Sequence, residues 1–360
     1  MDQNSVQNGS VTVADVARKA GVSKATAARV LGGYGTVSER VREIVTEAAR
    51  ALDYRPNELA RSMTTGRSGT IGVVVGDIEN PFFSLAVRGI TDVARKAGFT
   101  VILTNSGEDV AAEKAAVRTL LAKRVDGLIV SPAKDSDAEH LREVARSGRP
   151  LALLDRGVEA FDVDTVIADD RHAAEGITRQ LIALGHRRIA YLTACDTPDH
   201  VFRSPGDIST GSVRRRVEGY LDICREAGLT EMDSWVKMGA ATPETTRQMV
   251  TAMLKAKYRP TAIIASDSVI GLEVFKTTRA IGLSIPTDLS LVSFHDADWT
   301  AVTSPAVTVV RQPVYQLGET AANLIVERLN GLDAPARRVI LQTDVVQRAS
   351  IAVAPDIESF

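Results

Sequence analysis

Cysteine is scarce in this sequence of 360 residues, which contains only Cys195 and Cys224. Two thiols so far apart cannot build a disulfide framework or a cysteine zinc site, and we expect both to be reduced. The five histidines do not have metal-ligand spacing either. The sequence therefore predicts no metal site and no cofactor.

Long apolar runs are also missing. The longest, such as those at 71–75 and 151–154, are far shorter than the roughly 18 to 20 residues that cross a bilayer. Residues 1–10 are polar and have neither the charged start nor the apolar centre of a signal peptide. We therefore expect no membrane segment and a cytoplasmic location.

Motifs that carry catalysis are absent as well. The sequence contains no glycine-rich phosphate loop with a Lys-Ser/Thr pair and no GxSxG turn. Asp155 with Asp267 is a conceivable acid and base pair, but we interpret both as binding residues. The sequence therefore predicts that the protein is not an enzyme and has no catalytic residue.

Charge is distributed unevenly along the chain, whose formal net charge is −2. Residues 1–68 carry 10 Lys or Arg against 7 Asp or Glu, whereas the remainder carries 33 against 38. A basic excess confined to a short N-terminal module is expected where only that module meets the phosphates of a nucleic acid.

The pattern of residues 12–31 predicts a helix-turn-helix. Thr12 can cap a first helix, with Asp15 in the reciprocal position of a capping box, and Gly21 can adopt the positive φ that ends this helix. Ser23 can cap a second short helix. In this motif the N-terminal end of the second helix enters the major groove of DNA, so its first side chains are candidates for base contact.

A third helix is expected after Ser38. Its apolar stripe is expected at Val41, Ile44, Val45, Ala48 and Leu52. Three short helices that share one small core are enough for a DNA reader of roughly 45 residues. We place this reader at 11–56, after a flexible tail at 1–10.

From 69 to 354 short apolar runs alternate with helical patterns, which predicts a parallel α/β fold. The runs form two similar halves. The first is expected at about 69–160 plus 312–340, and the second at about 161–311 plus 341–354.

Crossovers between the two halves are expected near 157–162, 311–314 and 341. Ligands of open α/β sheets sit beyond the carboxyl ends of the strands, so we expect a ligand cleft between the halves. Polar residues collect at these strand ends, namely Asp77, Ser131, Asp155, Ser266, Asp267, His295 and Asp296.

Several stretches carry a specific resemblance when they are taken together. They are VTVADVARKAGVSKATAARVL, VSERVREIVTEAARALDYRPNELARSM and TGRSGTIGVVV, followed by ENPFF, KRVDGLIVSP, LGHRRIAYL, RPTAIIASD and TVVRQPVYQLGETAANLIVERLNG. In this order they resemble the LacI/GalR family of bacterial transcription regulators over nearly the whole chain. The resemblance implies an N-terminal all-α helix-turn-helix domain with a hinge helix, and a C-terminal α/β domain similar to type I periplasmic binding proteins.

The resemblance also implies a set of DNA-binding residues. They are Ser23, Lys24, Ala25, Thr26, Arg29, Leu59 and Met63. Lys24, Ala25 and Arg29 match the specificity positions of the family, where an arginine can hold a guanine edge and an alanine can contact a thymine methyl. Ser23 and Thr26 match positions near phosphates.

Residues 57–68 are expected to form a hinge helix and a linker. The helix itself, 57–66, is too short to be stable alone and should fold only against a partner. In the family, the two hinge helices of a dimer pack in the minor groove and each inserts an apolar side chain at the central base step. Met63 matches that side chain, where leucine is usual, and packing of Met63 against the second hinge is the alternative.

In the cleft, the resemblance implies a small-molecule effector, a sugar or a sugar derivative. The matching residues are Asp77, Phe82, Phe83, Ser131, Asp155, Arg214, Ser266, Asp267, His295 and Gln312. Carboxylates and a guanidinium can each hold two neighbouring hydroxyls of a sugar, and an aromatic face suits the apolar face of a pyranose.

Three features depart from the sugar-binding members of the family. His295 stands where Asp is common, Ser266 stands where Asn is common, and the stretch 196–211 is longer than the usual connection. For His295 two interpretations stay open, a structural histidine and a residue that contacts the ligand. Contact with the ligand would make ligand affinity sensitive to pH between about 6 and 7. Two further arginines follow Arg214, a run that is otherwise typical of a solvated face. The long stretch is either a lid or specificity loop, or an incidental insertion.

We therefore predict a dimeric transcriptional repressor that binds a pseudo-palindromic operator and whose DNA affinity is controlled by the effector. A purine or phosphorylated effector that acts as a corepressor is the alternative within this class. A stand-alone sugar-binding protein is the alternative from another class, and the DNA-binding pattern of residues 12–63 counts against it.

Overall fold

The computed structural model describes residues 11–32, 35–54 and 66–356. The chain divides into two compact units, Met1–Gly69 and Thr70–Phe360, which are taken in turn. The predicted tail at 1–10, most of the predicted hinge helix, and with it Leu59 and Met63, lie outside the described residues.

The first unit contains three described helices, α1 (Val13–Ala20), α2 (Lys24–Gly32) and α3 (Glu39–Ala51). The capping box predicted at the start of α1 is confirmed. The Thr12 N–H donates to Asp15 Oδ2 at 3.0 Å, and the Asp15 N–H donates to Thr12 Oγ1 at 3.4 Å. Gly21 ends α1 with a φ of +67°, as predicted.

A small apolar core joins the three helices. Its buried members are Val16, Ala17, Ala27, Val45, Ala48 and Ala49. Ile44, which the sequence analysis placed on the inward stripe of α3, is 42% exposed, so that placement is wrong. The core of three short helices covers only a narrow stripe of α3, and Ala49 rather than Ile44 lies within it.

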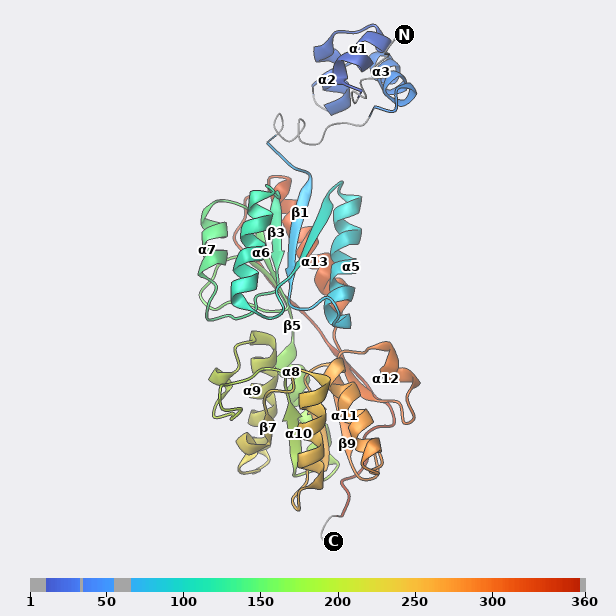
Figure 1. The fold of residues 1–360 in the computed structure, drawn as a ribbon. Coiled ribbons are helices and arrows are strands. Elements are labelled where there is room, and N and C mark those ends of the chain that lie inside the picture. The colour runs from blue at the N-terminus through green and yellow to red at the C-terminus, as the bar shows by residue number, and fades with distance from the viewer. Residues whose placement is uncertain (1–10, 33–34, 55–65, 357–360) are drawn as a thin grey trace, which may run out of the picture. The chain divides into compact units, whose positions relative to one another are not determined.

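The second unit has two lobes, each built on one six-stranded sheet. The sheet of the first lobe is parallel throughout, in the order β11-β5-β4-β3-β1-β2. Its strands are β1 (Thr70–Val75), β2 (Thr100–Asn105), β3 (Gly127–Val130), β4 (Leu151–Leu154), β5 (Asp164–Ala168) and β11 (Arg338–Leu341). Its helices are α5 (Pro81–Lys96), α6 (Val110–Ala122), α7 (Glu139–Arg146) and α13 (Val314–Leu329). The α5–α13 pair covers one face and the α6–α7 pair the other (Figure 1).

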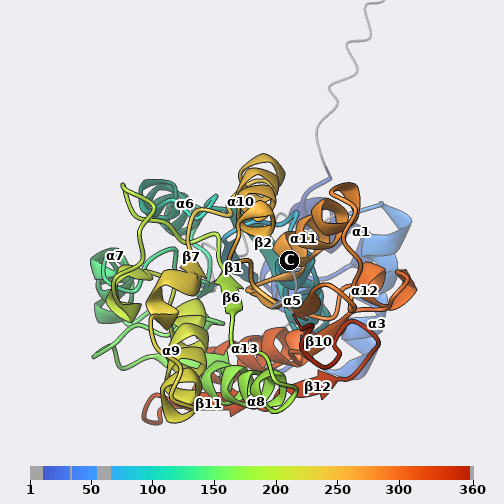
Figure 2. The ribbon, with the colours of Figure 1, turned by 90° about the horizontal axis from the view of Figure 1, so that it is seen from below.

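The sheet of the second lobe has the order β12-β10-β9-β8-β6-β7, with β12 antiparallel to β10. Its strands are β6 (Ile189–Leu192), β7 (Val236–Lys237), β8 (Ala262–Ala265), β9 (Ser290–Phe294), β10 (Thr308–Arg311) and β12 (Asp344–Val346). Its helices are α8 (Asp170–Ala183), α9 (Gly211–Glu226), α10 (Pro243–Lys255), α11 (Ser268–Ala280) and the short α12 (Asp298–Val302). As Figure 2 shows, α8 and α9 lie side by side on one face, and α10 and α11 lie on the other.

The two sheets repeat one topology. Across the sheet, the strand order β2-β1-β3-β4-β5 of the first lobe corresponds to the strand order β7-β6-β8-β9-β10 of the second. In each sheet the strand order reverses between the first and third strands of the repeat, which is β1 and β3 in one lobe and β6 and β8 in the other. A ligand is expected beyond the carboxyl ends of the strands at these two switch points.

The strand β5 corrects the sequence analysis. It was assigned to the second half, but it pairs with β4 in the first lobe, where Leu153 lies opposite Thr165. An apolar strand that is buried on both faces carries no sign of the sheet to which it belongs, so its pattern could not decide the matter. The first crossing between the lobes therefore follows Ala168 instead of lying at 157–162. The other two crossings lie at 312–313 and 342–343.

Within the described ranges, no helix combines the length and apolar character that crossing a bilayer requires.

Candidate functional site

The face of α2 that could read DNA is open to solvent. Ser23, Lys24, Ala25 and Arg29 are exposed, and Thr26 is half-buried. Ser23 caps the helix, because its Oγ accepts the Thr26 N–H at 3.1 Å. The first turn of α2 therefore presents its side chains outward, which is the arrangement that base contact in a major groove requires.

A cavity of about 480 Å³ lies at the carboxyl ends of the strands of both lobes. Eight of the ten predicted effector residues line it, namely Asp77, Phe82, Phe83, Asp155, Ser266, Asp267, His295 and Gln312. The other two, Ser131 and Arg214, do not. Ser131 is fully buried at the end of β3, where its N–H donates to the Val74 carbonyl at 2.9 Å.

Asp155 projects from the turn that follows β4. Its φ is +65°, a left-handed conformation that only a few per cent of residues other than glycine adopt, and which is a frequent mark of functional sites. One carboxylate oxygen, Oδ2, accepts the Ser212 hydroxyl from the opposite lobe at 3.2 Å. The other, Oδ1, is buried without a hydrogen-bond partner.

Arg216, not Arg214, is the arginine of α9 that lines the cavity. Its guanidinium is buried, donates to Asp170 Oδ1 and to the Ser266 carbonyl at 2.7 Å each, and stacks over Phe294 at 4.4 Å. The structure thus places Arg216 at the cavity and not the predicted Arg214. Two residues along a helix turn a side chain by roughly 200°, so only one of the two arginines can point inward.

Arg214 instead joins the two lobes outside the cavity lining. It forms an ion pair with Asp135, which follows β3 in the first lobe, and lies 3.9 Å from Glu159. The backbone N–H of Asp135 also donates to the Ser209 carbonyl of the second lobe at 3.3 Å. These contacts connect the lobes directly at one edge.

His295 follows β9 with a φ of +70° and is buried. Its Nδ1 lies 3.1 Å from the Ser268 hydroxyl. Burial and, to a smaller extent, the nearby Arg216 lower the pKa of His295 from 6.5 to about 4, against the opposing effect of Asp296. With its pKa lowered to about 4 the imidazole is neutral between about pH 6 and 7, which argues against the expected pH sensitivity of ligand affinity in that range.

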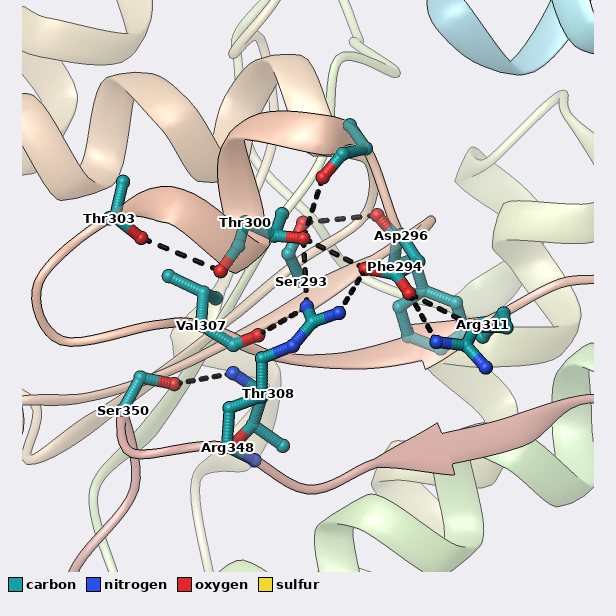
Figure 3. Close-up of polar contacts among 11 residues, drawn as sticks. Ser293, Phe294, Asp296, Thr300, Thr303, Val307, Thr308, Arg311, Arg348 and Ser350 are labelled. Atoms are coloured by element: carbon teal, nitrogen blue, oxygen red, sulfur yellow. Dashed lines mark hydrogen bonds and ion pairs between the residues drawn. The ribbon is translucent and has the colours of Figure 1, made fainter.

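Asp296, the next residue, is a structural group and does not line the cavity. Figure 3 shows its carboxylate between Arg311 and Arg348, each with an Nη2 at 2.7 Å. Thr300 Oγ1 also donates to it at 2.8 Å. Burial favours the neutral acid, but these hydrogen bonds prevail and lower the pKa of Asp296. The cluster fixes the turn that carries His295 to the strands next to the crossovers.

Asp267 both caps a helix and lines the cavity. Its Oδ1 accepts the N–H groups of Val269 and Ile270 at 2.8 and 2.9 Å, at the start of α11. Burial raises its pKa, while the two backbone donors act in the opposite direction. Ser266, immediately before it, is buried and offers its carbonyl to Arg216.

Aromatic rings form one wall of the cavity. Phe82 and Phe83 begin α5, with ring centroids 5.3 Å apart and planes perpendicular. Phe82 also meets the His295 ring of the opposite lobe edge to face at 6.1 Å. The wall therefore includes a contact between the lobes.

Several lining residues were missed by the sequence analysis. They include Glu108, Lys134, Arg156, Thr193, Asp196, Asp207, Thr210 and Arg216. Glu108 and Thr193 follow strands, so the rule of carboxyl ends could have found them. Asp196, Asp207 and Thr210 belong to the long stretch 196–211, whose two ends line the cavity. Among the described residues, no group of three or more His, Cys, Asp or Glu is placed to hold a metal ion.

An exposed recognition helix and a cavity between two lobes of repeated topology define a DNA-binding regulator with a domain similar to periplasmic binding proteins. Family models agree. The model of bacterial regulatory proteins of the lacI family matches residues 12–57, and that of the periplasmic binding proteins and sugar binding domain of the LacI family matches 68–349. The chain belongs to the LacI family and is a DNA-binding transcriptional repressor. The family consists of regulators rather than enzymes.

Relatives of similar length support this membership. The HTH-type transcriptional repressor PurR of Proteus mirabilis is 30% identical over 350 residues, 96% of this chain and 98% of that protein. Catabolite control protein A of Priestia megaterium is 31% identical over 320 residues, 89% and 93% of the two chains.

Solved structures give the same answer. A lac repressor dimer bound to operator and the anti-inducer ONPF matches with a TM-score of 0.82 and 26% identity, over 96% of this chain and all of that one. A complex of the transcriptional regulator CelR with cellobiose matches with a TM-score of 0.68 and 26% identity, over 94% and 99% of the two chains.

Proposed function

We propose that this repressor is controlled by a neutral, polyhydroxylated small molecule, a sugar or a sugar derivative, bound in the cavity between the lobes. The observation that carries the proposal is a group of buried polar atoms without hydrogen-bond partners in or beside the cavity. They are Asp155 Oδ1, Arg156 Nε, Gln312 Nε2 and Ser131 Oγ. The set includes an acceptor and donors, and a hydroxyl group is both donor and acceptor.

The charge of the lining supports a neutral ligand over a phosphorylated one. Six carboxylates line the cavity, those of Asp77, Glu108, Asp155, Asp196, Asp207 and Asp267, against the cations of Lys134, Arg156 and Arg216. Arg156 is already paired with Glu108, and Arg216 with Asp170. An anionic ligand would therefore enter a lining with an excess of negative charge.

Control of DNA binding requires that the ligand prefer one arrangement of the lobes. The proposed target is a pseudo-palindromic operator held by two reading heads of a homodimer in the cytoplasm. The solved lac repressor dimer, bound to its operator together with a small molecule, is consistent with this assembly. Coupling is reciprocal, so operator should change ligand affinity by the same factor by which ligand changes operator affinity.

A thermal-shift panel on the full chain tests the ligand class. It should contain neutral sugars, polyols, nucleobases and sugar phosphates. A true effector at about 100 times its dissociation constant adds roughly 2.7 kcal/mol of stability. Asp155→Asn should remove that shift, while Asp137→Asn, which removes an exposed carboxylate paired with Lys114, should keep it.

Two results would contradict the proposal separately. A shift produced by nucleobases or sugar phosphates alone would replace the proposed ligand class with the purine or phosphorylated alternative. A sugar that shifts the protein but leaves its gel-shift affinity for promoter DNA unchanged would contradict control by that ligand. The DNA complex itself should weaken as salt rises.

A further inference from the structure

Glu108 lies at the cavity on a turn built to hold it there. The turn follows β2, and its Gly107 N–H donates to the Gly76 carbonyl at 2.8 Å. Glu108 itself has a φ of +61°, which is uncommon for a residue with a side chain and marks a position held by its surroundings. Gly76 leaves the necessary room, because a Cβ there would lie only 2.0 Å from Glu108 Oε1.

The partner of Glu108 is the guanidinium of Arg156, which also lines the cavity. Arg156 Nη2 donates to Oε1 at 2.8 Å and Nη1 donates to Oε2 at 2.5 Å. Nη1 donates as well to the Pro132 carbonyl at 3.1 Å, and Nε lies 3.5 Å from Asp155 Oδ2. Burial opposes the charge of Arg156, but Glu108 and Asp155 raise its pKa, so the arginine is a cation with both terminal nitrogens occupied.

A guanidinium in a ligand cavity is well suited to anions, because its parallel N–H groups match a phosphate or carboxylate in a bidentate pair. In this cavity the carboxylate of Glu108 already forms that bidentate pair with Arg156. Asp267 of the opposite lobe adds a second carboxylate, close enough to Glu108 for the two charges to interact unfavourably. An entering anion would have to displace one carboxylate while it faces another.

We propose that Glu108 is a specificity-determining residue, which excludes phosphate- and carboxylate-bearing ligands from the cavity by occupying Arg156. This inference rests on the proposed function, because it gives a physical basis for selecting a neutral ligand at the same site. Gly76 is the positioning residue that makes the pair possible.

Titration of the full chain with inorganic phosphate at constant ionic strength tests the proposal by calorimetry. Wild-type protein should show no saturable binding that depends on Arg156. Glu108→Gln keeps the shape of the side chain and frees the guanidinium, so phosphate should bind at least about tenfold more tightly. Glu108→Gln combined with Arg156→Gln should lose the gain.

Two further variants separate charge from placement. Gly76→Ala keeps the Glu108 carboxylate in the protein but displaces it from Arg156, and should give part of the gain. Glu139→Gln makes the same change of net charge at an exposed carboxylate that pairs with Arg146 on α7, and should give none. Urea unfolding followed by the fluorescence of Trp235 and Trp299, which both belong to the same unit as the substitutions, establishes that each variant is folded.

The proposal is overturned if folded Glu108→Gln protein gains no phosphate binding, if the gain survives removal of Arg156, or if the wild type binds phosphate through Arg156. Thermal shifts with neutral ligands test the proposed function separately. A wild-type protein that is stabilised by no sugar or polyol contradicts that function, whatever the phosphate titration of Glu108→Gln shows.

Discussion

The substitution Arg216→Met should destabilise the second unit strongly. Arg216 is 5% exposed and Asp170 is 1% exposed, and the ion pair between them has an Nε to Oδ1 distance of 2.7 Å. Without Arg216, the nearest cation to Asp170 is Arg215 at 3.4 Å, and the carbonyl of Ser266 loses its donor. Removal of one partner from a buried pair costs about 3 to 5 kcal/mol, because the remaining charge stays buried.

Urea unfolding of the full chain measures this loss. The two tryptophans, Trp235 and Trp299, both belong to the second unit, so their fluorescence reports on that unit alone. The matched variant is Arg216→Met combined with Asp170→Asn, which removes the stranded charge and should recover at least about 2 kcal/mol. A single variant that costs less than about 1 kcal/mol, or a double variant that recovers nothing, would refute the buried pair as the source of stability.

Four more predictions follow from the described residues. Burial lowers the pKa of His295 from 6.5 to about 4 in the folded protein, so as the pH falls the unfolded chain takes up this proton before the folded protein does. The free energy of unfolding should therefore decrease by about 3 kcal/mol between about pH 6.5 and 4. His295→Gln should flatten that part of the pH profile measured by urea unfolding. Arg214→Gln leaves the largely buried Asp135 carboxylate without its ion-pair partner and should cost about 1 to 3 kcal/mol of stability, while keeping the effector-induced thermal shift, which Arg216→Met should abolish. On the DNA side, Arg29→Ala should weaken operator binding in gel shifts by about 1 to 3 kcal/mol, and Thr12→Ala should lower the melting stability of the reading head by about 1 kcal/mol.

Local features of the fold were predictable from the sequence. The cap at Thr12 and the end of α1 at Gly21 depend on neighbouring residues only, and both are confirmed. The strand ends are visible as polar residues after apolar runs, which is why Asp77 and Asp267 were placed at the cavity. The assignment of β5 was not predictable in this way, because its pairing with β4 is decided by contacts between distant segments.

The direction in which side chains point was the second feature that the sequence did not predict. Arg214 and Arg216 are two positions apart on α9, and the pattern of that helix does not say which one faces the cavity, since a valine flanks the arginine run on each side. Arg216 is selected by Asp170, a residue of α8 that lies 46 positions earlier. Glu108 could have been placed at the cavity by the rule of carboxyl strand ends, but its pairing with Arg156 was not predictable, because the positive φ that aims it and the room beside Gly76 exist only in the folded chain.

The repeated topology places two different groups in equivalent positions of the cavity. Asp155 follows β4 and His295 follows β9, the fourth strand of each repeat, and both adopt a left-handed φ. Each donates its backbone N–H to the next strand of its sheet, Asp155 to Val166 at 2.8 Å and His295 to Val310 at 2.9 Å. The backbone therefore presents equivalent side chains from the two lobes, one an anionic acceptor and the other a neutral imidazole. A ligand that contacts both must donate to the first lobe and can donate to or accept from the second, so the asymmetry of the site arises from two side chains on a symmetric scaffold.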